Sequence, residues 1–92
     1  MSNPKYRLLY TSTALKQLQK LDLSVAGRIT SKIEQLTNND QPLLSAKSLQ
    51  GELAGKYRYR IGDYRAIFSI DNKGVITLLT ILNISHRKDI YK

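Results

Sequence analysis

The segment Lys56–Phe68 constrains the fold of this chain more than any other part of the sequence. On both sides of Gly62-Asp63, arginine alternates with tyrosine and aliphatic residues. A period of two is typical of a strand with one buried face, and a glycine-containing pair between two such runs is typical of a tight hairpin turn. We therefore predict two antiparallel strands, Lys56–Ile61 and Tyr64–Ile70.

The same alternation assigns side chains to the two faces of this hairpin. If the aromatic and aliphatic side chains face the core, then Arg58, Arg60 and Arg65 all project from the opposite face. We expect an open, cationic sheet face, with four aromatic residues turned into the core: Tyr57, Tyr59, Tyr64 and Phe68.

Two amphipathic helices are predicted upstream of the hairpin. The β-prone run Tyr6–Tyr10 leads into Thr11-Ser12-Thr13, whose hydroxyls can cap a helix. Asp22–Ser24 forms a break and a second cap, and the second helix ends near Asn38. The apolar stripes are Leu15, Leu18 and Leu21 in the first helix, and Val25, Ile29, Ile33 and Leu36 in the second.

The remaining segments complete an α+β fold. The apolar residues of Asn38–Gly55 follow no period, so we predict a loop there. A third strand is predicted from Val75 to Ile84. The tail begins at Ser85 with a possible cap of one helical turn. The chain is expected to form one domain, residues 1–92, with an N-terminal strand, a helical hairpin and a three-stranded antiparallel meander.

Composition narrows the function. The 92 residues carry a formal net charge of +8, and residues 56–92 hold eight basic and three acidic side chains. Such a balance favours a polyanionic partner. The absence of cysteine excludes a thiolate metal site, a thiol nucleophile and disulfides. The longest apolar run, Val75–Leu82, is too short to span a bilayer, so we expect a soluble, cytoplasmic protein without a membrane partner.

Three converging arginines suit phosphate binding, because a guanidinium stays charged and matches phosphate oxygens in bidentate fashion. The alternative is that they only solvate the open face and discourage edge pairing. The single histidine, His86, could transfer protons near neutral pH, or it could simply complete a hydrogen-bond network. Tyr91 could stack on a base or pin the tail to the core.

Two segments carry a resemblance to a known family: Leu49–Phe68, and the ending Ile84-Ser-His-Arg-Lys-Asp-Ile-Tyr91. Together they resemble the RelE branch of the RelE/ParE toxin superfamily. The resemblance implies a microbial RNase-like fold and a toxin of a type II toxin-antitoxin system, which binds in the ribosomal A site and cleaves mRNA. It implies attack by a ribose 2′-hydroxyl on the adjacent phosphate, with no metal or other cofactor.

The resemblance also implies roles for individual residues. Arg58 and Arg60 match two basic residues that hold or activate the scissile nucleotide, although well-studied members have lysines at both positions. Arg65 matches a phosphate-stabilising arginine, and Tyr91 matches a tyrosine that stacks on the substrate base. From the residues and the resemblance together, we expect a catalytic set of Arg58, Arg60, Arg65, His86 and Tyr91, and an RNA-binding set of Lys56, Arg58, Arg60, Arg65, Arg87 and Lys88.

Two other functions stay open on the sequence. One is the ParE branch, whose members inhibit DNA gyrase without nuclease chemistry. The other is an RNA-binding module without catalysis. The expected partners are the ribosome, its mRNA and an acidic, RelB-like antitoxin that neutralises the basic toxin in a hetero-oligomer.

Overall fold

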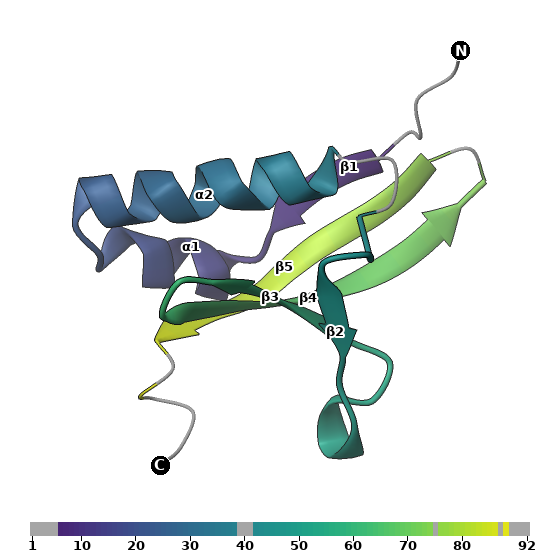
Figure 1. Ribbon diagram of the computed structural model, residues 1–92. Helices are drawn as coiled ribbons and strands as arrows, with labels where there is room; N and C mark the ends of the chain where they lie inside the picture. Colours follow the sequence, from purple (N-terminus) through teal and green to yellow (C-terminus); the bar gives the residue numbers. More distant parts are fainter. Residues whose placement is uncertain (1–5, 39–41, 75, 87, 89–92) are drawn as a thin grey trace.

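In the computed structural model, which describes residues 6–38, 42–74, 76–86 and 88, two helices pack on one side of a five-stranded mixed sheet (Figure 1). The strand order is β1-β5-β4-β3-β2, with β1 parallel to β5 and every other pair antiparallel. The strands are β1 (Tyr6–Tyr10), β2 (Ala46–Ser48), β3 (Tyr57–Ile61), β4 (Tyr64–Lys73) and β5 (Ile76–His86). The helices are α1 (Ser12–Gln19), α2 (Leu23–Thr37) and a short 3-10 turn, η1 (Gly51–Leu53).

The predicted α+β class and the hairpin are confirmed. Ile61 pairs with Tyr64, so Gly62 and Asp63 form the two-residue loop, and Gly62 takes a positive φ of 59°. A β-carbon is strained in that conformation, which explains glycine at this position. The meander is larger than predicted, because β2 adds a strand inside the segment expected to be a loop, and β1 pairs with the last strand.

The stripe predicted for helix α1 is correct at Leu18 and Leu21, which pack on the core, and wrong at Leu15. Thr11 is its N-cap, as expected, and its hydroxyl accepts from the Ala14 N–H at 3.1 Å. Ala14 and Leu18 are buried, whereas Leu15 is 47% exposed. The prediction for Leu15 was wrong because a stripe that repeats every three residues drifts round a helix of 3.6 residues per turn.

Helix α2 follows its prediction closely. Ile29 and Ile33 are buried, and Val25 and Leu36 pack partly buried against the same core. Asp22 stands at the N-cap, but its side chain makes no capping hydrogen bond. The apolar face, rather than the cap, therefore fixes this helix on the sheet.

The core lies between the helices and the sheet, and its centre is aromatic. Tyr59 and Phe68 are fully buried and stack with ring centroids 4.4 Å apart, and Tyr57 stacks on Phe68 at 5.7 Å. Tyr57 and Tyr64 are partly buried. The predicted inward placement of the aromatic residues is thus confirmed. Burial of each large side chain contributes about 1.5–3 kcal/mol to folding.

Strand β5 contains a bulge that changes which side chains face the helices. Ile67 pairs with Asn83, but Phe68 pairs with Ile81, so Leu82 has no partner in β4. Ile81 and Ile84 consequently both face the core. β1 ends at Tyr10, and beyond it the edge of β5 makes hydrogen bonds with helix α1 and its N-cap instead. The Thr11 hydroxyl donates to the Leu82 carbonyl at 3.2 Å, and the Ile84 N–H donates to Gln17 Oε1 at 2.6 Å.

Candidate functional site

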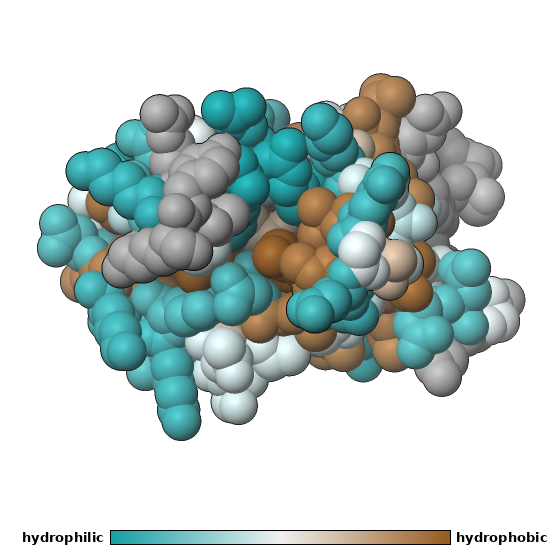
Figure 2. Space-filling model, turned by 90° about the horizontal axis from the view of Figure 1, so that it is seen from below, coloured by the Kyte–Doolittle hydropathy of each residue, from teal (hydrophilic) through white to brown (hydrophobic). Residues whose placement is uncertain are grey.

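The face of the sheet away from the helices carries the predicted arginines. Register pairs Arg58 with Ile67 and Arg60 with Arg65, and the buried Tyr59 and Ala66 lie between them on the other face. Because alternate residues of a strand point to opposite faces, Arg58, Arg60 and Arg65 share the open face, as predicted. Figure 2 shows this face, on which hydrophilic side chains surround a hydrophobic area.

Sequence reasoning missed Lys47, a further cation on this face that lies beside the predicted arginines. It lies in β2, directly opposite Arg58. Its neighbour Ala46 packs on the core, so Lys47 points to the open side. A strand of three residues is too short to show a period, and this is why the segment read as a loop.

Four of the cations on this face form two directly opposed pairs, Lys47–Arg58 and Arg60–Arg65. Like charges directly opposite each other destabilise a sheet, by up to about 1 kcal/mol per pair. An anion lying over the two pairs converts this repulsion into attraction. The arrangement is therefore better suited to holding phosphate groups than to stabilising the sheet, which argues against a merely solvating role for the arginines.

Arg58 differs from the other cations in its surroundings. It is partly buried, and among the described residues its Nη1 atom is shielded from water without a hydrogen-bond partner. Lys47 and Arg60 are exposed. A guanidinium withdrawn from water interacts more strongly with a nearby anion, because the surroundings screen it less.

Lys56 stands immediately before β3 and is partly buried. Its backbone closes the connection from β2 to β3, since its N–H donates to the Leu53 carbonyl at 3.0 Å and its carbonyl accepts from the Leu49 N–H at 2.9 Å. Lys56 therefore holds the start of the strand that presents Arg58.

His86 lies on the other face of the sheet from the arginines. The expected cap at Ser85 is wrong, because Ser85 and His86 belong to β5, and His86 pairs with Tyr64. The two rings meet edge to face, with centroids 5.0 Å apart. Nδ1 of His86 accepts from the Lys88 backbone N–H at 3.1 Å, so a neutral imidazole carries its proton on Nε2. In this arrangement His86 offers no proton acceptor to the arginine face.

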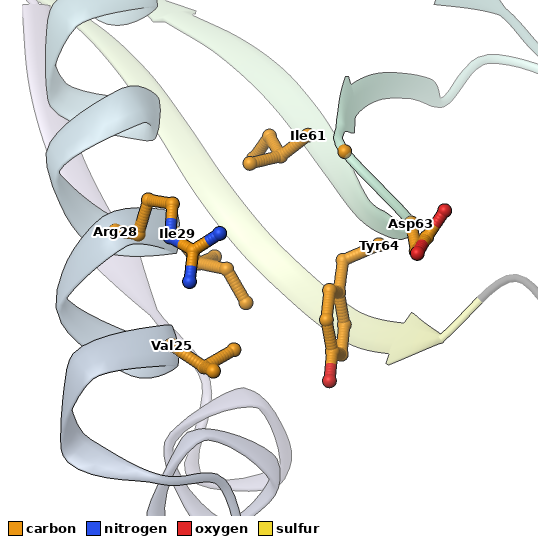
Figure 3. Close-up of a pocket in the computed structure, with 7 residues that line it drawn as sticks. Val25, Arg28, Ile29, Ile61, Asp63 and Tyr64 are labelled. Carbon is orange, nitrogen blue, oxygen red and sulfur yellow. The ribbon is translucent and has the colours of Figure 1, made fainter.

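Two cavities flank Tyr64 on the helix side. A groove of about 470 Å³ separates α1 from the end of β5 and is lined by Gln17, Lys20, Leu21, Tyr64, Asn83, Ile84, Ser85 and His86. A smaller cavity, of about 220 Å³, lies between α2 and the turn from β3 to β4. Figure 3 shows Arg28 and Tyr64 turned toward this cavity and the Asp63 carboxylate pointing away from it. Neither cavity includes a side chain of the two opposed pairs.

The other predicted site residues are in the tail. Lys88 is exposed, and Arg87 and Tyr91 lie outside the described residues. Within the described part of the chain, no three His, Asp or Glu side chains gather as metal ligands would. None of the helices described there has the length and hydropathy that a membrane-spanning segment needs.

Comparison with known proteins connects this surface to a family. The profile of the family described as "ParE toxin of type II toxin-antitoxin system, parDE" matches residues 8–91. Toxin RelG of Mycobacterium tuberculosis is 36% identical over 90 residues, which cover 95% of this chain and 97% of that protein.

Solved structures show the same relationship. A chain of the toxin-antitoxin complex RelBE2 from Mycobacterium tuberculosis is 31% identical, with a TM-score of 0.65 and 95% of both chains covered. A chain of the RelB-RelE antitoxin-toxin complex from Methanococcus jannaschii is 26% identical, with a TM-score of 0.66 and coverage of 91% of this chain and 95% of that one. The chain belongs to the RelE/ParE superfamily of toxins of type II toxin-antitoxin systems.

Proposed function

We propose that this toxin is an endoribonuclease that cleaves mRNA in the ribosomal A site and so inhibits translation. The observation that carries the proposal is the presence of two directly opposed cationic pairs on the open sheet face, Lys47–Arg58 and Arg60–Arg65. The similarity to Toxin RelG supports a toxin of the RelE type.

In the proposed reaction, the ribose 2′-oxygen forms a bond to the adjacent phosphorus and the bond from phosphorus to the 5′-oxygen breaks. The products are a 2′,3′-cyclic phosphate and a 5′-hydroxyl end, and the proton lost from the 2′-hydroxyl is balanced by one gained at the 5′-oxygen. Arg60 and Arg65 stabilise the extra negative charge on the non-bridging phosphate oxygens in the transition state. Arginine stays protonated, so it binds and stabilises here and does not accept the proton.

Proton transfer needs a further group. His86 lies on the helix side and donates from Nε2 when neutral, so the geometry supports a structural role for it next to Tyr64. Separate Tyr91→Phe and His86→Gln variants locate the group. A variant that loses cleavage while it keeps RNA binding and a cooperative melting transition identifies the group that moves the proton.

The test of the function is induction of the wild-type chain and the Arg65→Ala variant in cells, followed by mapping of mRNA 5′ ends. We expect the wild type to arrest growth and to create new ends within translated codons, and Arg65→Ala to do neither. Arg7→Ala is the matched control, because Arg7 lies on β1, at the other edge of the same sheet face. Equal arrest by the wild type and Arg65→Ala contradicts the proposal. Arrest with intact mRNA and trapped DNA gyrase supports the ParE-type alternative instead.

We also propose that an acidic antitoxin binds this chain in the cytoplasm. The support is the net charge of +8 and the similarity to chains of two solved toxin-antitoxin complexes. A short acidic reading frame next to this gene should rescue growth when it is co-expressed, and its product should co-purify with the toxin. Absence of both effects contradicts the proposal.

A further inference from the structure

The reaction proposed above assigns steps to Arg60 and Arg65 but gives the Lys47–Arg58 pair no individual role. The pairing of β2 with β3 places Lys47 opposite Arg58, two residues along β3 from Arg60. Lys47 is exposed, whereas Arg58 is partly buried. Each of the two opposed pairs, Lys47–Arg58 and Arg60–Arg65, therefore brings together two cations from neighbouring strands.

The backbone on both sides fixes the position of Lys47. The Tyr59 hydroxyl donates at 2.9 Å to the carbonyl of Pro42, a buried residue four positions before β2. The Ala46 N–H donates to the Leu43 carbonyl at 3.1 Å, and the Leu49 N–H donates to the Lys56 carbonyl at 2.9 Å. These contacts hold β2 in register with β3, so Lys47 stays beside Arg58 rather than moving as part of a free loop.

The distance between the two opposed pairs can be compared with the spacing of phosphates in RNA. Arg58 and Arg60 are two residues apart on one strand, which is about 6.8 Å along its axis. This distance is comparable with the separation of neighbouring phosphates in an extended RNA strand. The spacing of the two cationic pairs, Lys47–Arg58 and Arg60–Arg65, therefore matches that of two consecutive phosphates.

We propose, on the basis of the proposed function, that Lys47 and Arg58 bind the phosphate next to the scissile one, while Arg60 and Arg65 bind the scissile phosphate itself. The RNA backbone then follows the direction of β3. Lys47 is a substrate-binding residue in this arrangement, and its contact is insensitive to base identity because it reaches only the phosphate.

The experiment measures cleavage of synthetic mRNA on programmed ribosomes. One mRNA is unmodified, and two others carry a single neutral methylphosphonate, immediately 5′ or immediately 3′ of the scissile phosphate. Lys47→Gln is compared with Lys47→Arg, which keeps the charge, and with Lys32→Gln, which removes an exposed lysine from α2.

We expect Lys47→Gln to lower kcat/KM on unmodified mRNA by about 5- to 10-fold, the loss of one charge-assisted contact. On one of the two modified mRNAs the same substitution should cause no further loss, because the contact is already absent there. Lys47→Arg and Lys32→Gln should stay near the wild type.

Other outcomes separate the inference from the function. If Lys47→Gln cleaves all mRNAs like the wild type, or loses the same factor on all three, the second phosphate site is wrong while the proposed nuclease stands. If the wild type cleaves none of these mRNAs, the proposed function fails, and this inference fails with it. Melting curves of each variant identify a loss that comes from unfolding.

Discussion

Replacing Lys47 by glutamine is expected to make the protein more stable while it weakens the toxin. Lys47 lies directly opposite Arg58 across β2 and β3. Arg58 is partly buried, and its Nη1 atom has no hydrogen-bond partner among the described residues. Removal of the lysine charge relieves this repulsion, and Lys47→Glu replaces it with attraction.

The size of the effect follows from the geometry of the pair. Side chains directly opposite each other in a sheet interact by about 0.2–1 kcal/mol. We expect Lys47→Gln to raise the free energy of unfolding by about 0.5 kcal/mol and Lys47→Glu by about 1 kcal/mol. For a domain of this size, 1 kcal/mol corresponds to about 4–8 °C, so the expected increases in Tm are about 2–4 °C and about 4–8 °C.

Thermal unfolding at low and high salt measures the effect. Salt at about 1 M shortens the screening length to about 3 Å, so the gain should shrink there. Arg7→Gln is the control, because Arg7 lies on the other edge strand of the same face, opposite the uncharged Leu78. The reasoning is refuted if the Lys47 variants melt at or below the wild-type temperature in low salt. It is also refuted if Arg7→Gln gives the same increase, since the cause is then the net charge.

Three further predictions concern the fold. Tyr59→Phe should lower the free energy of unfolding by about 1–3 kcal/mol, because the substitution leaves the buried Pro42 carbonyl without its hydrogen bond. Tyr10→Phe should leave the free energy of unfolding unchanged or raise it, because Tyr10 Oη is buried without a partner among the described residues. Urea unfolding of both variants measures the difference. Gln17→Ala should destabilise the protein by about 1 kcal/mol and speed hydrogen exchange at the Ile84 amide, and unchanged exchange contradicts this role. Burial, with a smaller contribution from Glu34, raises the pKa of Tyr10, and burial raises that of Tyr59. As pH rises, the unfolded chain therefore loses the two phenolic protons before the folded chain does, and the free energy of unfolding should fall above about pH 10. The fall should be less steep in Tyr10→Phe. Urea titrations at a series of pH values measure it.

Local patterns predicted the features that depend on one strand or one helix. Alternation along β3 and β4 placed the arginines on one face and Tyr59 and Phe68 in the core, since the side-chain period of a strand is two wherever it pairs. The stripe of α2 predicted its buried face for a similar reason. Helix α1 has only eight residues, too few for a stripe to distinguish Ala14 from Leu15 as the buried residue.

The sequence by itself determined that this chain is a basic α+β protein with Arg58, Arg60 and Arg65 on an open sheet face, because those properties follow from charge and from the period of single strands. Only the tertiary structure decided where Lys47 and His86 lie. Lys47 lies on the arginine face because the three-residue strand β2 pairs with β3. His86 lies on the opposite face because a bulge at Leu82 shifts the alternation of β5 by one residue. Both depend on hydrogen bonds between segments distant in sequence, which no local pattern records.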